Sequence, residues 1–196
     1  VWVSYDTNCN GLPDDTWYEL AGSDYGNPAT RHAYTLTYSA PDPDREPVKN
    51  GSFIDDAAYI AWTDSDGASG FVPHNIFHKQ SYWPMWLHDR TCSLSGSCLP
   101  PNAIDTSGNG TYFVLYSFAW GYVDNHPNDN DELNSFKIDW AVDADGMPVA
   151  LPGIDFVRVQ TGINQYCGWI GETSTELSKA VDLHIPILPD LPPEPI

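Results

Sequence analysis

Side-chain oxygens recur at alternate positions in residues 6–15, whose sequence is DTNCNGLPDD. Asp6, Asn8 and Asn10 occupy the first, third and fifth positions of this segment, and Gly11 occupies the sixth. Alternate residues of a tightly wound loop converge on one point, and glycine at the sixth position allows a sharp bend. Because Ca²⁺ takes about six to eight oxygen ligands, this spacing predicts the first half of a calcium-binding loop.

The second half of the loop departs from the common calcium-loop spacing. That spacing ends in a glutamate at position 12, whereas position 12 of this loop is Trp17. Two aspartates must then complete the ligand shell, together with a backbone carbonyl and an acid from elsewhere in the chain. The predicted calcium ligands are Asp6, Asn8, Asn10, Leu12, Asp14 and Asp15. The alternative is an acidic hairpin that binds no ion.

A second group of acidic and amide side chains follows an aromatic segment over residues 112–122. Its spacing is irregular, and Pro127 breaks any helix that would order it. A second cation site and a solvated acidic turn are therefore equally consistent with this segment. The candidate ligands of the second site are Asp124, Asn125, Asp129 and Asp131.

Aromatic, amide and basic side chains are concentrated in residues 74–88. In sugar-binding sites, flat rings cover the apolar faces of sugar rings while polar groups bond the hydroxyls. The alternative is that these rings fill the core beneath a proline-containing loop, because aromatic side chains dominate burial in most domains. The predicted carbohydrate-binding residues are Tyr82, Trp83, Trp86 and Trp169.

No pattern in the sequence indicates catalysis. The chain has no GxSxG nucleophile motif and no glycine-rich phosphate loop. Glu172 and Glu176, four residues apart on one strand, would lie about 13 Å apart, which is too far for a glycosidase pair. We therefore expect a non-catalytic ligand-binding module. The alternatives are a glycosidase or lyase on the same scaffold and an adhesion or spacer module.

The four cysteines indicate an oxidising compartment and hence a secreted or cell-surface protein. Cys92 and Cys98 flank a short segment of small residues that can close into a loop, which leaves Cys9 to pair with Cys167. The sequence therefore predicts two disulfides. Zinc is the alternative, but none of the cysteines has the CxxC spacing of a zinc knuckle.

The elements that must position these groups are predicted to be strands. Residues 34–38 alternate in polarity, residues 156–161 contain a β-branched run, and prolines interrupt most segments where a helix would begin. We predict an all-β fold in which two antiparallel sheets pack as a β-sandwich with jelly-roll topology. Further strands are expected at residues 1–5, 17–21, 59–62, 112–120, 136–142 and 174–185.

Length and composition limit the organisation and the partners of the chain. The 196 residues fit a single domain over residues 1–185, followed by a Pro-rich linker over residues 186–196. With 27 acidic and 8 basic residues, the formal net charge is −19, which argues against nucleic acid as a partner. No apolar run approaches the roughly 18 residues of a membrane span, so we expect no membrane insertion.

The pattern DxNxNGxPDD resembles the calcium loops of thrombospondin type 3 repeats, dockerins and many secreted bacterial surface proteins. The whole chain is similar to an uncharacterised group of bacterial cell-surface proteins, and residues 14–23, 77–84, 154–162 and 168–172 carry this similarity. The resemblance implies a secreted, surface-exposed module that lies next to other β domains. It implies no activity and no particular ligand.

Overall fold

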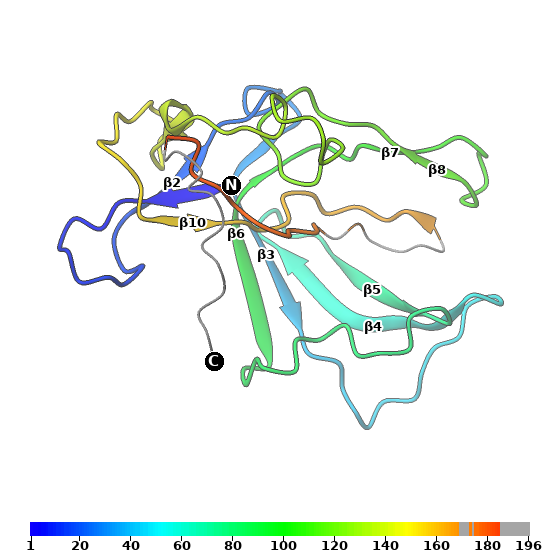
Figure 1. The fold of residues 1–196 in the computed structure, drawn as a ribbon. Helices are drawn as coiled ribbons and strands as arrows, with labels where there is room; N and C mark the ends of the chain where they lie inside the picture. The colour runs from blue at the N-terminus through cyan, green and yellow to red at the C-terminus, as the bar shows by residue number, and fades with distance from the viewer. Residues whose placement is uncertain (169–172, 174, 185–196) are drawn as a thin grey trace, which may run out of the picture.

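Most of the regular structure in the computed structural model consists of short strands (Figure 1). The structure describes residues 1–168, 173 and 175–184. Its strands are β1 (Trp2–Ser4), β2 (Trp17–Leu20), β3 (Arg31–Ser39), β4 (Ile54–Asp64), β5 (Ser69–Asn75), β6 (Thr91–Cys98), β7 (Ala103–Asp105), β8 (Phe113–Leu115), β9 (Ala141–Val142) and β10 (Phe156–Arg158). One 3-10 turn, η1 (Ile138–Trp140), precedes β9. Within the described ranges, no helix is long and apolar enough to cross a bilayer.

Two four-stranded sheets form the body of the fold. Sheet A has the strand order β10-β1-β2-β9, and sheet B has the order β5-β4-β3-β6. A separate two-stranded ribbon consists of β7 and β8. All of these strand pairs are antiparallel, and the two larger sheets have a sandwich-like arrangement (Figure 1). The predicted all-β, antiparallel class is therefore confirmed.

Sheet B has the connectivity of a Greek key. Strands β3, β4 and β5 pair in chain order, and β6 returns to lie beside β3. A jelly roll contains two Greek keys, whereas sheet A joins the first two strands of the chain to β9 and β10. The jelly-roll topology therefore stays a prediction.

Each sheet has its own buried cluster. In sheet A, Val3, Leu20 and Ala141 pack together, and aromatic residues of the segment that includes η1 cover them. In sheet B, Tyr34 and Leu36 are buried on one face of β3, while the threonine between them is only partly buried. The alternation predicted for residues 34–38 is confirmed, because a strand directs successive side chains to opposite faces.

The end of sheet B contacts sheet A at Gly96 of β6. A Cβ atom at this position would lie 2.8 Å from the Trp2 ring, and φ of Gly96 is +151°. Arg158 also packs on this ring, with its guanidinium carbon 4.8 Å from the ring centroid. Glycine is therefore required where the two sheets meet, because any side chain would displace Trp2.

Strand β6 lies where the sequence predicts a flexible loop over residues 93–97. The hydroxyls of Ser93 and Ser95 instead bond across to Thr37 and Thr35 of β3, at 2.8 and 2.9 Å. Small polar residues therefore form the outer face of a strand here. Their composition is typical of loops, but their alternation with Cys92 and Leu94 has the period of a strand.

This strand overturns the predicted Cys92–Cys98 disulfide. The two cysteines are at opposite ends of β6, and six steps of extended chain span about 20 Å, whereas a disulfide needs Cα atoms within about 7 Å. The predicted Cys9–Cys167 bond is also absent, because all four cysteines are free thiols. Cys9 is exposed in the β1–β2 loop, whereas Cys167 is buried. The cysteines therefore do not support an oxidising compartment, and the secreted or cell-surface location stays a prediction that rests on the resemblance to bacterial cell-surface proteins.

Several other predicted strands are shorter than expected. Residues 112–120 contribute only β8, and residues 136–142 form η1 followed by β9. The predicted strand over residues 174–185 is wrong, because the described residues 175–184 contain no strand. The predicted linker at residues 186–196 lies outside the described residues.

We predict that a non-reducing digest of the folded protein contains no peptide pair linked through Cys92 and Cys98. The strand geometry holds these residues too far apart, so mass spectrometry after alkylation under native and denaturing conditions should find both as thiols. A Cys92–Cys98 link in folded protein would contradict the position of β6.

We predict that Gly96→Ala destabilises the protein by about 1–3 kcal/mol, because the added methyl group overpacks against Trp2. Gly153→Ala is the matched control, since a Cβ atom there meets no atom within 4 Å. The control should change the free energy of unfolding, measured in urea, by no more than about 0.5 kcal/mol. Equal effects of the two substitutions would show that the contact between Gly96 and Trp2 does not form.

Candidate functional site

The predicted calcium loop connects β1 to β2 at one end of sheet A, where Figure 1 shows it in dark blue. Two hydrogen bonds close its base. The Ser4 hydroxyl donates to the Thr16 carbonyl at 2.9 Å, and the Trp17 indole donates to the Pro13 carbonyl at 3.3 Å. Because Ser4 and Trp17 are paired in the sheet, the strands fix both ends of the loop.

Asp6 organises the first half of the loop. Its two carboxylate oxygens accept the backbone N–H groups of Asn10 at 3.1 Å and Gly11 at 2.8 Å. The Asn8 side-chain oxygen accepts the same Asn10 N–H at 3.0 Å. Cys9 and Gly11 have φ values of +57° and +73°, so the backbone turns around the Asp6 carboxylate. The structure thus brings Asp6, Asn8 and Asn10 into one turn.

The two aspartates that end the loop differ in their bonding. The Asp14 carboxylate accepts the side-chain amides of Asn8 at 3.4 Å and of Asn10 at 3.1 Å. One oxygen of Asp15 accepts the Thr7 hydroxyl. The other oxygen, Oδ2, is buried and has no hydrogen-bond partner. Across the part of the chain that the structure describes, it is the one buried side-chain polar atom without a partner.

This unpartnered oxygen makes the loop a fitting site for a hard cation. Burial of a carboxylate oxygen without a donor is costly, and a divalent cation beside it would offset the cost. Among the described residues, no three His, Cys, Asp or Glu side chains gather closely enough to hold a metal ion. The candidate ligand set is a mixed one, in which the amide oxygens of Asn8 and Asn10 and the Leu12 carbonyl join the carboxylates.

Asp155 reaches the loop from the other end of the chain. Its Oδ2 accepts the backbone N–H of Asp6 at 2.7 Å, and its own N–H donates to the Ser4 carbonyl at 2.9 Å. The sequence requires an additional acid near the loop but contains no local signal that identifies Asp155. This residue directly precedes β10, and it meets Asp6 because β10 pairs with β1.

The β7–β8 turn has the same spacing of oxygens as the predicted calcium loop. Asp105, Ser107 and Asn109 occupy its first, third and fifth positions, and Gly110 is the sixth. The Gly110 N–H donates to Asp105 Oδ2 at 2.8 Å, as Gly11 does to Asp6. The Ser107 hydroxyl and the Gly110 N–H lower the pKa of Asp105. No buried oxygen is left without a partner in this turn.

The residues of the second predicted metal site have other partners. Asn125 uses its side-chain oxygen and nitrogen on the backbone N–H and carbonyl of Phe118, at 2.8 and 2.7 Å. Asp124 accepts the Glu176 N–H at 3.0 Å and has a φ of +56°. Asp129 and Asp131 lie on the exposed turn that follows. The Asn125 amide therefore fixes a loop, and the described geometry does not gather the four residues around one point.

Tyr82 packs within the protein rather than facing solvent. Its hydroxyl accepts the Asn75 N–H at 3.2 Å, and its ring stacks on His74 with centroids 4.7 Å apart. Tyr59 meets the Tyr82 ring edge-on at 5.5 Å. This aromatic cluster supports the β5–β6 connection, and the carbohydrate-binding role of Tyr82, which is half-buried, stays a prediction.

The other predicted carbohydrate-binding residues lie along the same connection or beyond the described chain. Trp83 is half-buried. Trp86 is 78% exposed, and its neighbour Met85 is 84% exposed. Trp169 lies outside the described residues. Of the predicted residues that the structure describes, Trp86 is therefore the ring that solvent reaches most fully.

No family model matches this chain, and a search of curated proteins finds no significant match.

Proposed function

We propose that this chain is a calcium-stabilised binding module of a secreted or cell-surface protein, and that it binds carbohydrate without catalysing a reaction. The observation that carries the calcium part is the buried, unpartnered Oδ2 of Asp15 in a loop of hard oxygen ligands. The carbohydrate part is supported by the exposed Trp86 on a connection that an aromatic cluster holds in place.

Calcium would act as a cross-link at the end of sheet A. The predicted ligands span residues 6–15, which connect β1 to β2, and Asp155 joins the same loop to the start of β10. An ion held there would stabilise the ends of three neighbouring strands. The loop is solvent-exposed, a setting typical of the weaker calcium sites of extracellular modules, which bind at about 0.1–1 mM.

Carbohydrate is the ligand class that best suits the exposed aromatic connection. A flat indole ring covers the apolar face of a sugar ring, and an exposed Trp without a ligand leaves apolar area in water. The formal charge of −19 does not oppose a neutral glycan, whereas it opposes polyanions.

We predict that calcium raises the melting temperature of the wild-type protein and that a chelator reverses the effect. At 100 times the dissociation constant, the added stability is about 2.7 kcal/mol, or roughly 5–10 °C for a domain of this size. Magnesium at the same concentration should have a smaller effect, because it requires stricter octahedral geometry. A melting temperature that calcium leaves unchanged would contradict the proposed site.

We predict that the effect of Asp15→Asn on the melting temperature has opposite signs in calcium-free and calcium-loaded protein. Without calcium the variant should melt at or above the wild-type temperature, because it removes a buried charged oxygen that lacks a donor. With calcium it should bind the ion at least about tenfold more weakly. Asp105→Asn is the matched control from the similar turn, and it should lower the melting temperature equally with and without calcium. Equal calcium responses in both variants would exclude Asp15 as a ligand.

We predict that Trp86→Ala weakens binding to an immobilised polysaccharide panel by about tenfold or more, because ring stacking on the sugar is lost. Met85→Ala is the matched control, since Met85 is equally exposed but has no ring. Binding by glycan array and by affinity electrophoresis should distinguish the two. Absence of any binding by the wild-type protein would refute the carbohydrate part and leave a spacer or adhesion module.

A further inference from the structure

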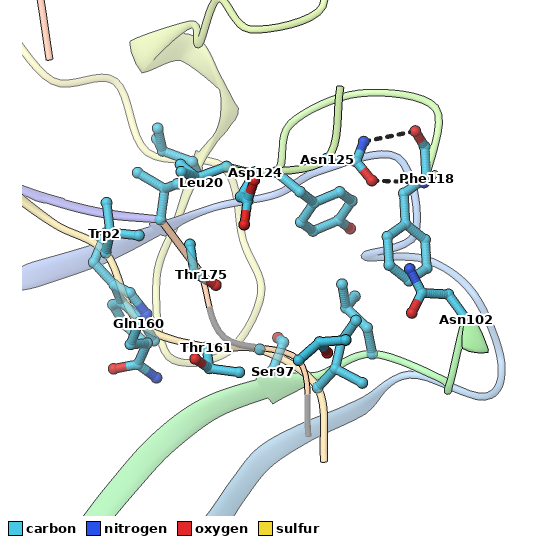
Figure 2. Close-up of a pocket in the computed structure, with 18 of the residues that line it drawn as sticks. Trp2, Leu20, Ser97, Asn102, Phe118, Asp124, Asn125, Gln160, Thr161 and Thr175 are labelled. Atoms are coloured by element: carbon cyan, nitrogen blue, oxygen red, sulfur yellow. Dashed lines mark hydrogen bonds between the residues drawn. The ribbon is translucent and has the colours of Figure 1, made fainter. Parts of the chain in front are cut away.

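A cavity of about 460 Å³ lies between sheet A and the end of β6, away from the calcium loop and from Trp86. Figure 2 shows Trp2 and Gln160 on one side of it and Phe118 and Asn102 on the other. This volume is within the range of small-molecule sites, about 300–1,000 Å³. Five groups of described residues that are distant in the sequence contribute to its walls: the β1–β2 pair, residues 97–102, residues 115–125, residues 159–163, and Thr173 with Thr175.

Glu19 of β2 is the polar centre of one wall. It is paired directly with Trp2 across β1 and β2, so both side chains project from the same face of sheet A. The Ser97 hydroxyl donates to the Glu19 carboxylate at 2.9 Å, and a ring nitrogen of His32 lies 3.0 Å from the same hydroxyl. Burial raises the pKa of Glu19, while the bond from Ser97 opposes the rise.

The charge of the cavity limits its ligand. Of the described residues that line it, Glu19 and Asp124 carry carboxylates, and none has the side chain of Lys, Arg or His. The α-ammonium group of Val1 also lines the cavity and interacts electrostatically with Glu19. Asp124, which lies beside Leu20 in Figure 2, has a left-handed backbone conformation, φ +56°, which is uncommon for a residue other than glycine. An anionic ligand would meet two carboxylates, and the Val1 ammonium group is already attracted to Glu19, so this cavity disfavours an anion.

The aromatic wall is rigid. Asn125 clamps the backbone of Phe118 through two hydrogen bonds, as Figure 2 shows. The Tyr122 hydroxyl accepts the Asp24 N–H at 3.0 Å, and burial raises the pKa of Tyr122 to about 12. The Phe118 and Tyr122 rings lie 5.1 Å apart. A ligand would therefore enter a preformed site, which lowers the entropy that binding costs.

We propose that this cavity is a subsite for one neutral sugar ring, whose hydroxyls donate to Glu19 and whose apolar face lies against the aromatic wall. The inference rests on the proposed carbohydrate-binding function and adds a site distinct from Trp86. Rigid aromatic rings beside a few convergent acceptors, with no basic side chain, match the chemistry of an uncharged polyhydroxyl ligand. A small organic ammonium ion is the competing ligand class, because the two carboxylates and the aromatic rings would attract a cation.

The test is calorimetric titration with a panel of neutral mono- and disaccharides, and separately with a primary alkylammonium salt. Glu19→Gln keeps the shape of the side chain and should weaken saccharide binding at least about tenfold, the effect of a lost hydrogen bond to a charged acceptor. Glu132→Gln, on an exposed turn, is the matched charge control and should bind as the wild type does. Trp86→Ala should also keep its affinity for these short saccharides.

The outcomes separate the two proposals. Saccharide binding that Glu19→Gln retains and Trp86→Ala loses would overturn the cavity subsite and leave the carbohydrate function standing. Absence of saccharide binding by the wild type would refute both, and binding of the alkylammonium ion alone would overturn the ligand class. In case Glu19→Gln folds poorly, the indole N–H resonance of Trp2 in the wild type provides a second measurement. It should shift on addition of sugar, and an unmoved Trp2 resonance would overturn the subsite.

Discussion

The position of β1 between β2 and β10 is the constraint on which the rest of the structure depends. Trp2 is paired with Glu19 on one side and with Arg158 on the other. Trp2 and Arg158 are thus neighbours in space although they are more than a hundred positions apart in the sequence. At the end of this three-stranded unit, Asp155 meets Asp6 of the predicted calcium loop. On one of its faces, Trp2 and Glu19 form the wall of the cavity.

Several aspartates in the described turns accept backbone N–H groups. Asp64 accepts the N–H groups of Asp66 and Ala68, and Asp143 accepts those of Asp145 and Met147. Such turns account for part of the excess of aspartate over glutamate without any cation. Asp15 differs from them because one of its oxygens is buried without a donor. Alternate spacing of oxygens alone therefore does not separate an ordinary turn from the proposed cation site. The observed difference is whether every buried carboxylate oxygen has a hydrogen-bond donor.

Local sequence patterns predict the fold class and the β1–β2 loop, because both depend on residues that are neighbours in the chain. The alternation around Tyr34 and Leu36 locates β3, and the spacing from Asp6 to Gly11 locates a tight turn of oxygens. The Ser-rich strand β6 is missed because small polar residues have weak strand preference, and pairing with β3 decides their conformation. The wrong Cys92–Cys98 disulfide follows directly from that error.

The cavity could not be predicted in the same way. Glu19 is flanked by apolar residues of β2 and has no partner nearby in the sequence, and its bond to Ser97 depends on the contact between the two sheets. Asp124 lies in a segment whose composition indicates a metal site or a solvated turn, yet its place is at a cavity wall. In both cases the partner is supplied by a strand or loop far along the chain, so tertiary structure alone reveals the role.

A high-resolution crystal structure grown with calcium tests the central claim most directly. The account predicts an ion about 2.3–2.6 Å from Asp15 Oδ2, with further oxygen ligands from Asp6, Asn8 and Asn10. A calcium-soaked crystal in which Asp15 Oδ2 instead accepts a hydrogen bond from water or protein, with no ion in the loop, would contradict it.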